Sequence, residues 1–221
     1  MSNTPNTGYF ISLEGGEGAG KTSQINKLAQ AITAQGRRVV TTREPGGTQE
    51  AESIRNLLVQ RDGGDWNPMA ETLLLFAARA MHIEKIIKPA LNDGCVVICD
   101  RFTDSTMAYQ GYGRGLDIER IREIERVSID GFAPDLTFIL DLDVRTGLER
   151  SYKRLASEKG YDKTEDRFER MDLSFHEKLR EGFLDIARKN DDRCYILNAA
   201  QDIDNIAVEI QNIALSKLQA L

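Results

Sequence analysis

A glycine-rich loop near the start of the chain constrains its fold more than any other feature. The stretch EGGEGAGKTSQ, residues 14–24, contains the pattern G-x-x-x-x-G-K-[ST], completed by Gly15, Gly20, Lys21 and Thr22. An apolar run, YFISLE, precedes the loop, and residues of helical period follow it. Such a loop turns backbone N–H groups toward one anion, at a helix N-terminus that adds partial positive charge. The pattern therefore predicts a strand, a phosphate-binding loop and a helix in an α/β fold.

Each part of this loop has an expected contact. Lys21 reaches the outer phosphates of a nucleoside triphosphate, and the Thr22 hydroxyl is suited to ligate Mg²⁺. The residues expected to bind the triphosphate are Gly15, Gly16, Glu17, Gly18, Ala19, Gly20, Lys21 and Thr22. The alternative is a chance match in a glycine-rich turn, which does not account for the flanking strand and helix. The loop alone does not identify a reaction, because switches, motors and kinases share it.

Apolar runs alternate with stretches of helical period along the chain. Strands are expected at YFISLE, RVVTTRE, CVVICD, LTFILD and CYILN, and helices near Lys21, Glu50, Pro68, Thr103, Asp117, Val144, Asp172 and Ile203. Asn67 is an expected N-cap before Pro68, and the long helix that starts there has to stop near Gly94. This alternation predicts a parallel sheet covered by helices. With 221 residues we expect one domain at 9–221 after a flexible tail at 1–8.

Charge and cysteine content narrow the classes of partner and compartment. The chain has 29 Lys and Arg residues against 35 Asp and Glu residues, a formal net charge of -6, which does not favour nonspecific binding to nucleic acid or an anionic membrane. Cys95, Cys99 and Cys194 show no paired spacing and fit buried thiols of a reducing compartment. No run reaches the length of a membrane span, and the first residues, MSNTPNTG, are polar. We therefore expect a cytoplasmic protein without nucleic-acid or membrane partners.

The strand CVVICD ends in Asp100, and Arg101 follows it directly. A carboxylate there suits the Mg²⁺ shell, and the arginine suits a phosphate. The alternatives are that Asp100 caps the next helix and that Arg101 forms a surface salt bridge. The strings D-x-x-G and N-K-x-D, which guanine-nucleotide switches normally carry, do not occur. The sequence thus favours a phosphoryl-transfer site over a guanine-nucleotide switch.

Several longer strings together resemble one known family. EGGEGAGKT, TREPGGT, FAAR, DRFTDSTMAYQGYGRG and PDLTFILD occur in the order and approximate spacing of the bacterial thymidylate kinases, and the likeness runs from about Gly8 into the last helix. The combination of TREPGGT with DR…S…AYQG is far more specific than the phosphate loop. The resemblance implies transfer of the γ-phosphoryl group of ATP to dTMP, giving dTDP and ADP for dTTP synthesis. It also implies a three-layer phosphate-loop kinase fold with a five-stranded parallel sheet, a mobile lid at about 153–168, Mg²⁺ as cofactor, and a homodimer.

Two other functions use parts of the same pattern. Another nucleoside monophosphate kinase, for dUMP, dCMP or AMP, would share the phosphate loop and the lid. An ATP-dependent switch or binding module would hydrolyse ATP whether or not a monophosphate is present, whereas a kinase needs its acceptor.

Phosphoryl transfer to a monophosphate needs cations more than it needs a base. The acceptor phosphate is already ionised at neutral pH, so two polyanions have to be brought into line. The middle of the phosphate loop offers Glu17 and no arginine, so the catalytic cation is expected in or beside the charged segment SEKGYDKTEDRFERMD, residues 157–172, which is expected to be an exposed loop flanked by helices. The cations of this region are Arg150, Lys153, Arg154, Lys159, Lys163 and Arg167. By resemblance Arg154 and Arg167 approach ATP, and the alternative for each is a solvated surface. The residues expected to act in catalysis are Glu17, Lys21, Arg101 and Arg154.

The stretch ETLLLFAAR is expected to supply the binding site of the acceptor base. Arg79 lies three residues from Phe76 and four from Leu75, on one helix face. In the family a phenylalanine four residues before this arginine stacks on thymine, and the arginine hydrogen-bonds the base. Here leucine occupies that position. Either Phe76 stacks from a rotated helix, or Leu75 covers the base while Phe76 lies in the core.

Other acceptor contacts are expected from three further segments. Ser105, Thr106, Tyr109 and Gln110 share a helical surface. By resemblance Ser105 or Thr106 and Gln110 approach the thymine edge, and Tyr109 packs where a 2′-hydroxyl would otherwise fit; the alternative for Tyr109 is a cap on a hydrophobic patch. By the same resemblance Arg101 and Arg55 hold the acceptor phosphate, and the turn at Glu44 borders the acceptor cleft. The alternative for Glu44 is a simple pair with Arg43 or another cation.

Glu17 is an unexpected carboxylate in a loop that holds a polyanion. One interpretation is a local ion pair with Lys21, four residues later. By resemblance, Glu17 instead accepts a hydrogen bond from the 3′-hydroxyl of dTMP, so that one loop contacts both substrates.

Overall fold

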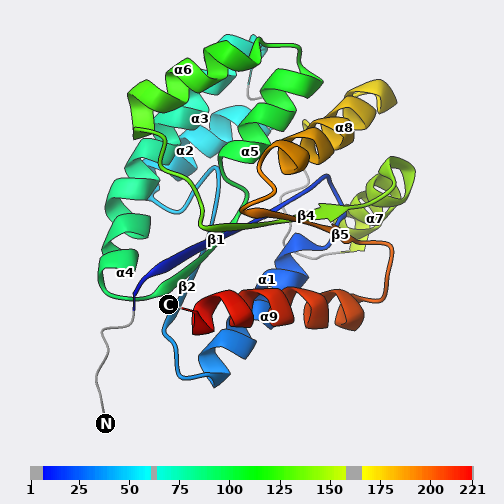
Figure 1. Cartoon of the computed structure of the whole chain (residues 1–221). Coiled ribbons are helices and arrows are strands. Elements are labelled where there is room, and N and C mark those ends of the chain that lie inside the picture. The colour runs from blue at the N-terminus through cyan, green and yellow to red at the C-terminus, as the bar shows by residue number, and fades with distance from the viewer. Residues whose placement is uncertain (1–6, 61–63, 158–165, 221) are drawn as a thin grey trace.

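The computed structural model describes residues 7–60, 64–157 and 166–220, and its centre is a parallel sheet (Figure 1). The five strands lie in the order β2-β3-β1-β4-β5, and all neighbouring pairs are parallel. Their bounds are β1 Tyr9–Glu14, β2 Val39–Arg43, β3 Val96–Asp100, β4 Leu136–Asp141 and β5 Cys194–Asn198. The predicted five-stranded parallel sheet is confirmed.

Helices cover both faces of the sheet. Their bounds are α1 Lys21–Ala34, α2 Gln49–Val59, α3 Pro68–His82, π-helix η1 Ile83–Ile87, α4 Lys88–Asn92, α5 Thr103–Thr106, π-helix η2 Met107–Gly113, α6 Ile118–Ile129, α7 Val144–Ser157, α8 Leu173–Lys189 and α9 Ile203–Gln219. Helices α1 and α9 lie on one face, and α3, α5, α6 and α8 lie on the other (Figure 1). The three-layer α/β architecture expected from the sequence is therefore confirmed.

The central strand β1 divides the apolar core into two halves. All six of its residues are buried, because strand side chains alternate between two covered faces. Ile11 and Leu13 belong to the core on the α1 and α9 side, and Phe10 belongs to the core on the other side. The carboxyl end of β1 lies beside that of β3, where Leu13 is in register with Asp100. The phosphate loop after β1 and the Asp100–Arg101 pair therefore meet at one edge of the sheet.

The long helix expected from Pro68 is present but not uniform. Asn67 Oδ1 accepts a hydrogen bond from Ala70 N at 2.9 Å, which confirms the predicted N-cap. The helix widens into η1 and continues as α4 until Gly94, where φ is 73°. A second widening, η2, follows α5 and carries Tyr109 and Gln110. Wider helical turns often occur at functional sites, where they rotate side chains relative to a regular helix.

The charged segment expected to form the lid is described only at its two ends. Lys159 and Lys163 lie outside the described residues, as does most of the expected N-terminal tail. The expectation of an exposed loop at 157–172 is wrong for residues 166–169, because Asp166 is buried and the three residues after it are half-buried. The Phe168 ring packs edge-on against the Tyr109 ring, with centroids 5.2 Å apart. This part of the segment therefore belongs to the packed structure.

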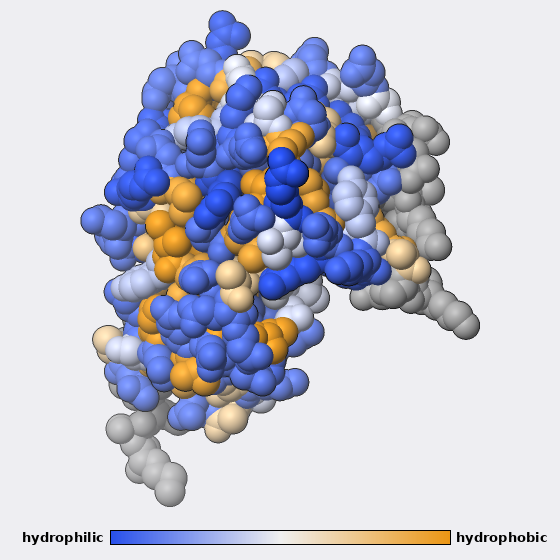
Figure 2. Space-filling view, turned by 90° about the vertical axis from the view of Figure 1, so that its right-hand side faces the viewer, coloured by the Kyte–Doolittle hydropathy of each residue, from blue (hydrophilic) through white to orange (hydrophobic). Residues whose placement is uncertain are grey.

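Hydrophilic side chains predominate on the face shown in Figure 2, with apolar side chains in smaller areas between them. Within the described ranges, none of the helices has the length and apolar character needed to cross a membrane.

Candidate active site

A cleft of about 1110 Å³ opens at the carboxyl edge of the sheet. One side is lined by the phosphate loop and the start of α1, and the other by residues of α2, α3 and η2. Of the predicted site residues, those that line the cleft are Glu17, Gly18, Ala19, Gly20, Lys21, Thr22, Glu44, Arg55, Leu75, Arg79, Asp100, Arg101, Ser105, Thr106, Tyr109, Gln110, Arg154 and Arg167. The fold thus gathers side chains from distant segments of the chain around one cavity.

Lys21 lies against the loop that precedes it. Its Nζ atom donates to Gly15 O at 3.0 Å and to Gly16 O at 2.9 Å. Burial, followed by the charge of Arg101, lowers the pKa of Lys21 to about 8. Gly20, with φ 91°, is the N-cap residue of α1 and provides no side-chain cap, so the first backbone N–H groups of the helix stay available to an anion. The loop therefore has the geometry predicted for phosphate binding.

Two side-chain oxygens that would suit a hard cation lie next to this loop. Thr22 Oγ1 is 3.4 Å from Asp100 Oδ2, and Asp100 Oδ1 is buried without a hydrogen-bond partner. Mg²⁺ prefers oxygen ligands and usually keeps waters and substrate phosphates beside one or two protein groups. The residues present fit such an ion. Asp100 does not cap the following helix, because the N-cap position of α5 is Phe102 and no side chain caps it.

Glu17 contacts three side chains other than Lys21. Tyr109 Oη donates to Glu17 Oε1, Arg101 Nη2 lies 3.5 Å from the same oxygen, and His176 Nδ1 lies 3.4 Å from Oε2. Burial acts to raise the pKa of Glu17, but His176, Arg101 and Tyr109 outweigh it and lower the pKa to about 2. The alternative interpretation, an ion pair with Lys21, is not what holds Glu17, since Lys21 donates to loop carbonyls.

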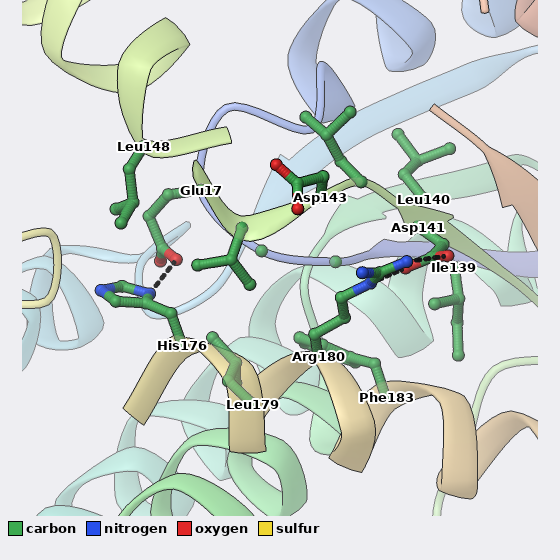
Figure 3. Close-up of a pocket in the computed structure, with 14 residues that line it drawn as sticks. Glu17, Ile139, Leu140, Asp141, Asp143, Leu148, His176, Leu179, Arg180 and Phe183 are labelled. Atoms are coloured by element: carbon green, nitrogen blue, oxygen red, sulfur yellow. Dashed lines mark hydrogen bonds and ion pairs between the residues drawn. The ribbon is translucent and has the colours of Figure 1, made fainter. Parts of the chain in front are cut away.

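Figure 3 shows the small cavity on the far side of Glu17, with His176 on α8 facing the carboxylate. The cavity has a volume of about 30 Å³, the space of about one water. His176 Nε2 is buried and has no hydrogen-bond partner. Farther along α8, Arg180 holds Asp141 through two hydrogen bonds of 2.6 and 2.9 Å. Sequence reasoning did not predict His176, because it is a single polar residue within an apolar helix face.

Arg101 sits under the loop in an unusual backbone conformation. Its φ is 69°, in the left-handed region that residues other than glycine seldom adopt. Its Nη1 atom donates to Gly15 O at 2.9 Å and to Ser105 Oγ at 3.2 Å, and its guanidinium lies 5.0 Å from the centre of the Tyr109 ring. The side chain is only 20% exposed, so the surface salt-bridge alternative for Arg101 is wrong.

A second buried carboxylate supports this arrangement. Glu14 accepts from Phe102 N at 2.7 Å and from Ser105 Oγ at 2.5 Å. Burial and the charge of Asp104 raise the pKa of Glu14 to about 8. Ser105 is therefore held by Glu14 and Arg101 under the loop. Sequence reasoning assigned no role to Glu14, because the partners that explain its burial are about 90 residues away.

On the other side of the cleft, Arg79 is a buried cation that hydrogen bonds hold in place. It donates from Nε to Glu44 Oε2 at 2.7 Å and from Nη2 to Thr106 Oγ1 at 3.1 Å, while its Nη1 is buried without a hydrogen-bond partner. Glu44 also accepts from His82, which contacts Thr42 at 2.7 Å. Glu44 is thus paired with Arg79 rather than with Arg43, whose partner is Glu52. His82 was not predicted.

The structure separates the two candidates for covering a base. Phe76 is 1% exposed and belongs to the apolar core, whereas Leu75 lines the cleft. The Arg79 guanidinium lies 4.7 Å from the centre of the Phe76 ring, so Phe76 supports the arginine from the core side. The arrangement favours Leu75 as the apolar cover.

Tyr109 and Gln110 lie on η2 at the bottom of the cleft. Tyr109 packs edge-on against Phe168 and Phe175, with ring centroids 5.2 and 6.0 Å apart, while its hydroxyl reaches Glu17. Burial raises the pKa of Tyr109. Gln110 donates from Nε2 to Glu71 Oε2 at 3.0 Å, and its Oε1 is buried without a hydrogen-bond partner. These contacts give the cleft a rigid aromatic wall with an adjacent polar edge.

The arginines expected from the lid occupy different positions. Arg154 and Arg167 both line the cleft, but Arg167 contacts Leu58 O at 2.9 Å and the carboxylate of Glu71, on the α2 and α3 side. Arg55 also lines the cleft and donates to Pro45 O at 3.2 Å. Arg167 therefore lies nearer to the residues expected for the acceptor than to the phosphate loop, and its predicted contact with ATP stays a prediction.

Comparisons with known proteins place this geometry in context. The thymidylate kinase family model matches residues 13–210. The chain is 46% identical to the thymidylate kinase of Caulobacter vibrioides over 211 residues, which is 96% of this chain and 98% of that protein. It is 44% identical to the thymidylate kinase of Geotalea uraniireducens over the same shares of each chain. The crystal structure of thymidylate kinase from Ehrlichia chaffeensis matches with a TM-score of 0.74 at 37% identity, covering 94% of this chain and 99% of that chain.

Proposed function

The chain belongs to the thymidylate kinase family, and we infer that it transfers the γ-phosphoryl group of ATP to dTMP, giving dTDP and ADP. The observation that carries this conclusion is one cleft of about 1110 Å³ lined both by the phosphate loop and by Arg79, Tyr109 and Gln110. A cleft of this size has room for two nucleotides. The enzyme is thus a nucleoside monophosphate kinase whose donor and acceptor sites share one cavity.

On the donor side, we propose that ATP lies along the phosphate loop. Its phosphates would accept from the N–H groups at the start of α1, and Lys21 would exchange its contacts with the Gly15 and Gly16 carbonyls for contacts with phosphate oxygens. Burial lowers the pKa of Lys21. The negative charge of the bound phosphates would act in the opposite direction and keep the lysine protonated. Thr22 and Asp100 would hold Mg²⁺, which, when bound, neutralises phosphate charge.

On the acceptor side, we propose that Arg101 and Arg55 hold the phosphate of dTMP. Arg101 is already fixed by Gly15 O and Ser105, so little side-chain freedom is lost on binding. Glu17 is buried between Tyr109 and Arg101, in position to accept from the 3′-hydroxyl. The Tyr109 ring, packed on Phe168, would fill the space of a 2′-hydroxyl. These contacts favour a deoxyribonucleotide as the acceptor.

The base would lie between Leu75 and the polar edge formed by Arg79 and Gln110. Arg79 Nη1 is a donor and Gln110 Oε1 is an acceptor, and both are buried without a hydrogen-bond partner. Thymine offers an acceptor at O4 and a donor at N3, so it would satisfy both atoms. The transfer itself needs no general base, and the cations and the exclusion of water lower the barrier.

We also propose a cytoplasmic homodimer. All three cysteines are buried, unpaired thiols, which fits a reducing compartment. Leu73 on α3 and Val127 on α6 are apolar side chains exposed by 52% and 79%, and they support a partner surface on these two helices. Light scattering coupled to size exclusion would measure the assembly, and a mass equal to one chain would contradict it.

An acceptor screen tests the proposed function directly. ADP production from ATP and Mg²⁺ is measured with dTMP, dUMP, dCMP and AMP in turn. We expect turnover to rise sharply on addition of dTMP and less with the other acceptors. Turnover that does not depend on a monophosphate would indicate a switch or binding module, and a preference for AMP or dCMP would indicate a different monophosphate kinase.

A further inference from the structure

Glu71 is a buried carboxylate at the start of α3. No role was predicted for it from the sequence. It is 1% exposed, and three side chains from other segments donate to it. Gln110 Nε2 reaches Oε2 at 3.0 Å, and Arg114 Nη1 reaches Oε1 at 3.1 Å. Arg167 donates to Oε1 as well. Arg114 and Gln110 both come from the run that contains η2, so Glu71 fixes this run against α3.

The chemistry of Glu71 determines which way the Gln110 amide faces. A carboxylate held by two guanidinium groups is an acceptor only. The NH₂ end of the Gln110 amide must therefore face Glu71, which leaves the amide oxygen for the cleft. That oxygen, Oε1, is buried and has no hydrogen-bond partner, and Gln110 lines the cleft. Glu71 thus converts an amide that could present either end into a fixed hydrogen-bond acceptor.

A hydrogen-bond acceptor and a hydrogen-bond donor that are both fixed in position can pair with only one class of pyrimidine base. Arg79 Nη1 is the donor, and Arg79 is held by Glu44 and by Thr106, four residues before Gln110. Thymine and uracil present N3–H and O4, which complement these two atoms. Cytosine presents an unprotonated N3 and an amino group, the reverse pattern, so each buried atom would face its own kind.

We propose that Glu71 is a positioning residue that determines base specificity, because it holds the Gln110 amide oxygen toward the cleft and so makes the site reject cytosine nucleotides. This inference rests on the proposed function, in which the base of dTMP lies against Arg79 and Gln110. A merely structural Glu71 would tie α3 to Arg114 and Arg167 and nothing more. Its loss would then lower activity with every acceptor by the same factor, whereas orientation of an amide changes the ratio between acceptors.

The experiment measures kcat/KM for dTMP, dUMP and dCMP in the wild-type enzyme and in Glu71→Gln. A glutamine at this position can donate to Gln110, so the Gln110 amide can turn its nitrogen toward the cleft. We expect the dTMP to dCMP ratio to fall by about tenfold or more. The dTMP to dUMP ratio should stay unchanged, because both bases have the same N3 and O4 groups.

The control variants separate the loss of the Glu71 charge from the change in the orientation of the Gln110 amide. Glu71→Gln leaves Arg114 and Arg167 without their carboxylate, which is expected to destabilise the fold. The double variant Glu71→Gln/Arg114→Gln removes one cation with the anion, and Arg114→Gln alone keeps Glu71. We expect the double variant to show the lowered dTMP to dCMP ratio and Arg114→Gln to keep the wild-type ratio. Gln110→Met, which leaves position 71 intact, should lower the ratio as well.

The possible results distinguish a failure of the proposed kinase function from a failure of the proposed role of Glu71. If the wild-type enzyme does not phosphorylate dTMP, the proposed function fails. If it does, and the ratio is the same in the double variant and in Arg114→Gln, only the role of Glu71 is overturned. An unchanged ratio in Gln110→Met would also overturn it, because the oxygen that Glu71 orients would then not read the base.

Discussion

The imidazole of His176 lies against the carboxylate of Glu17, with Nδ1 3.4 Å from Oε2, on the side of the phosphate loop that faces α8. His176 is 3% exposed, and its contact with Glu17 is a cause of the lowered pKa of that carboxylate. The other oxygen of Glu17 accepts from Tyr109. A carboxylate with a neighbour at each oxygen has little freedom to rotate, which suits the proposed contact with a hydroxyl of the acceptor.

From this contact we predict that His176→Leu lowers kcat/KM for dTMP by about tenfold, because the buried Glu17 carboxylate loses its polar neighbour at 3.4 Å from Oε2. Discrimination against the 3′-deoxy analogue of dTMP should fall with it, since Glu17 would be less well oriented. His176→Asn, which keeps a donor near the position of Nδ1, is expected to restore most of both. In a Glu17→Gln background, His176→Leu should change neither quantity; a further loss there would show that His176 acts through other contacts.

Glu14 predicts a pH dependence of stability. Burial raises its pKa from 4.5 to about 8, so the folded state holds a proton that the unfolded state releases earlier. Its stabilising contribution is complete below pH 4.5 and is lost as the pH rises through about 8. The slope is at most about 1.4 kcal/mol per pH unit.

The measurement is urea denaturation between pH 5 and 9 for the wild-type enzyme and Glu14→Gln. The glutamine can accept from Phe102 N and donate to Ser105 Oγ without a charge, so we expect it to flatten this part of the profile. Equal slopes in the two proteins would contradict the assignment of the proton to Glu14. Glu52 is a half-buried control carboxylate nearer the surface, and its side chain is paired with Arg43. Glu52→Gln should leave the slope in this range unchanged, because the pKa of Glu52 is lowered.

The sequence predicted the framework of this site more completely than its contacts. The sheet, the loop and the positions of Lys21, Asp100 and Arg101 follow from alternation and from one local motif. Glu14, Glu71, His82 and His176 could not be predicted, because each acts through partners brought close only by the packing of distant segments. Glu71 and Gln110, for example, are 39 residues apart, and nothing local to Glu71 indicates that pairing.

Leu75 and Phe76 show a different limit of prediction from sequence. Both are apolar neighbours on one helix, and which of them faces the cleft depends on the rotation of α3 about its axis. Burial of Phe76 in the core cluster that contains Phe102 accompanies that rotation, and periodicity does not resolve a difference of one residue. The polar segment at 166–169 was misjudged for a related reason: its charged side chains are satisfied by buried partners such as Glu71.

The Tyr109 ring is predicted to exclude ribonucleotides. Tyr109→Ala removes the aromatic wall packed on Phe168 and Phe175, so it should raise kcat/KM for ribothymidine monophosphate relative to dTMP by about tenfold. Tyr109→Phe keeps the ring and should keep the preference, while losing the hydrogen bond to Glu17. Circular dichroism checks that both variants fold. A preference that is unchanged in Tyr109→Ala, or lost in Tyr109→Phe, would assign sugar selection to another residue.

Arg154 and Arg167 should give opposite kinetic patterns. Arg154 lines the cleft at the end of α7, and we predict that Arg154→Ala depresses kcat more than it raises KM for dTMP, because a cation on the transferring group acts mainly in the transition state. Arg167 contacts Leu58 O and Glu71 beside the proposed acceptor site, so Arg167→Ala should mainly raise KM for dTMP. Arg170, which is exposed on the same segment, gives a matched control, and Arg170→Ala should leave both constants near wild type. Steady-state kinetics at saturating ATP measures all three variants. A selective loss of kcat in Arg167→Ala, with KM for dTMP unchanged, would return Arg167 to the ATP site that the sequence predicted.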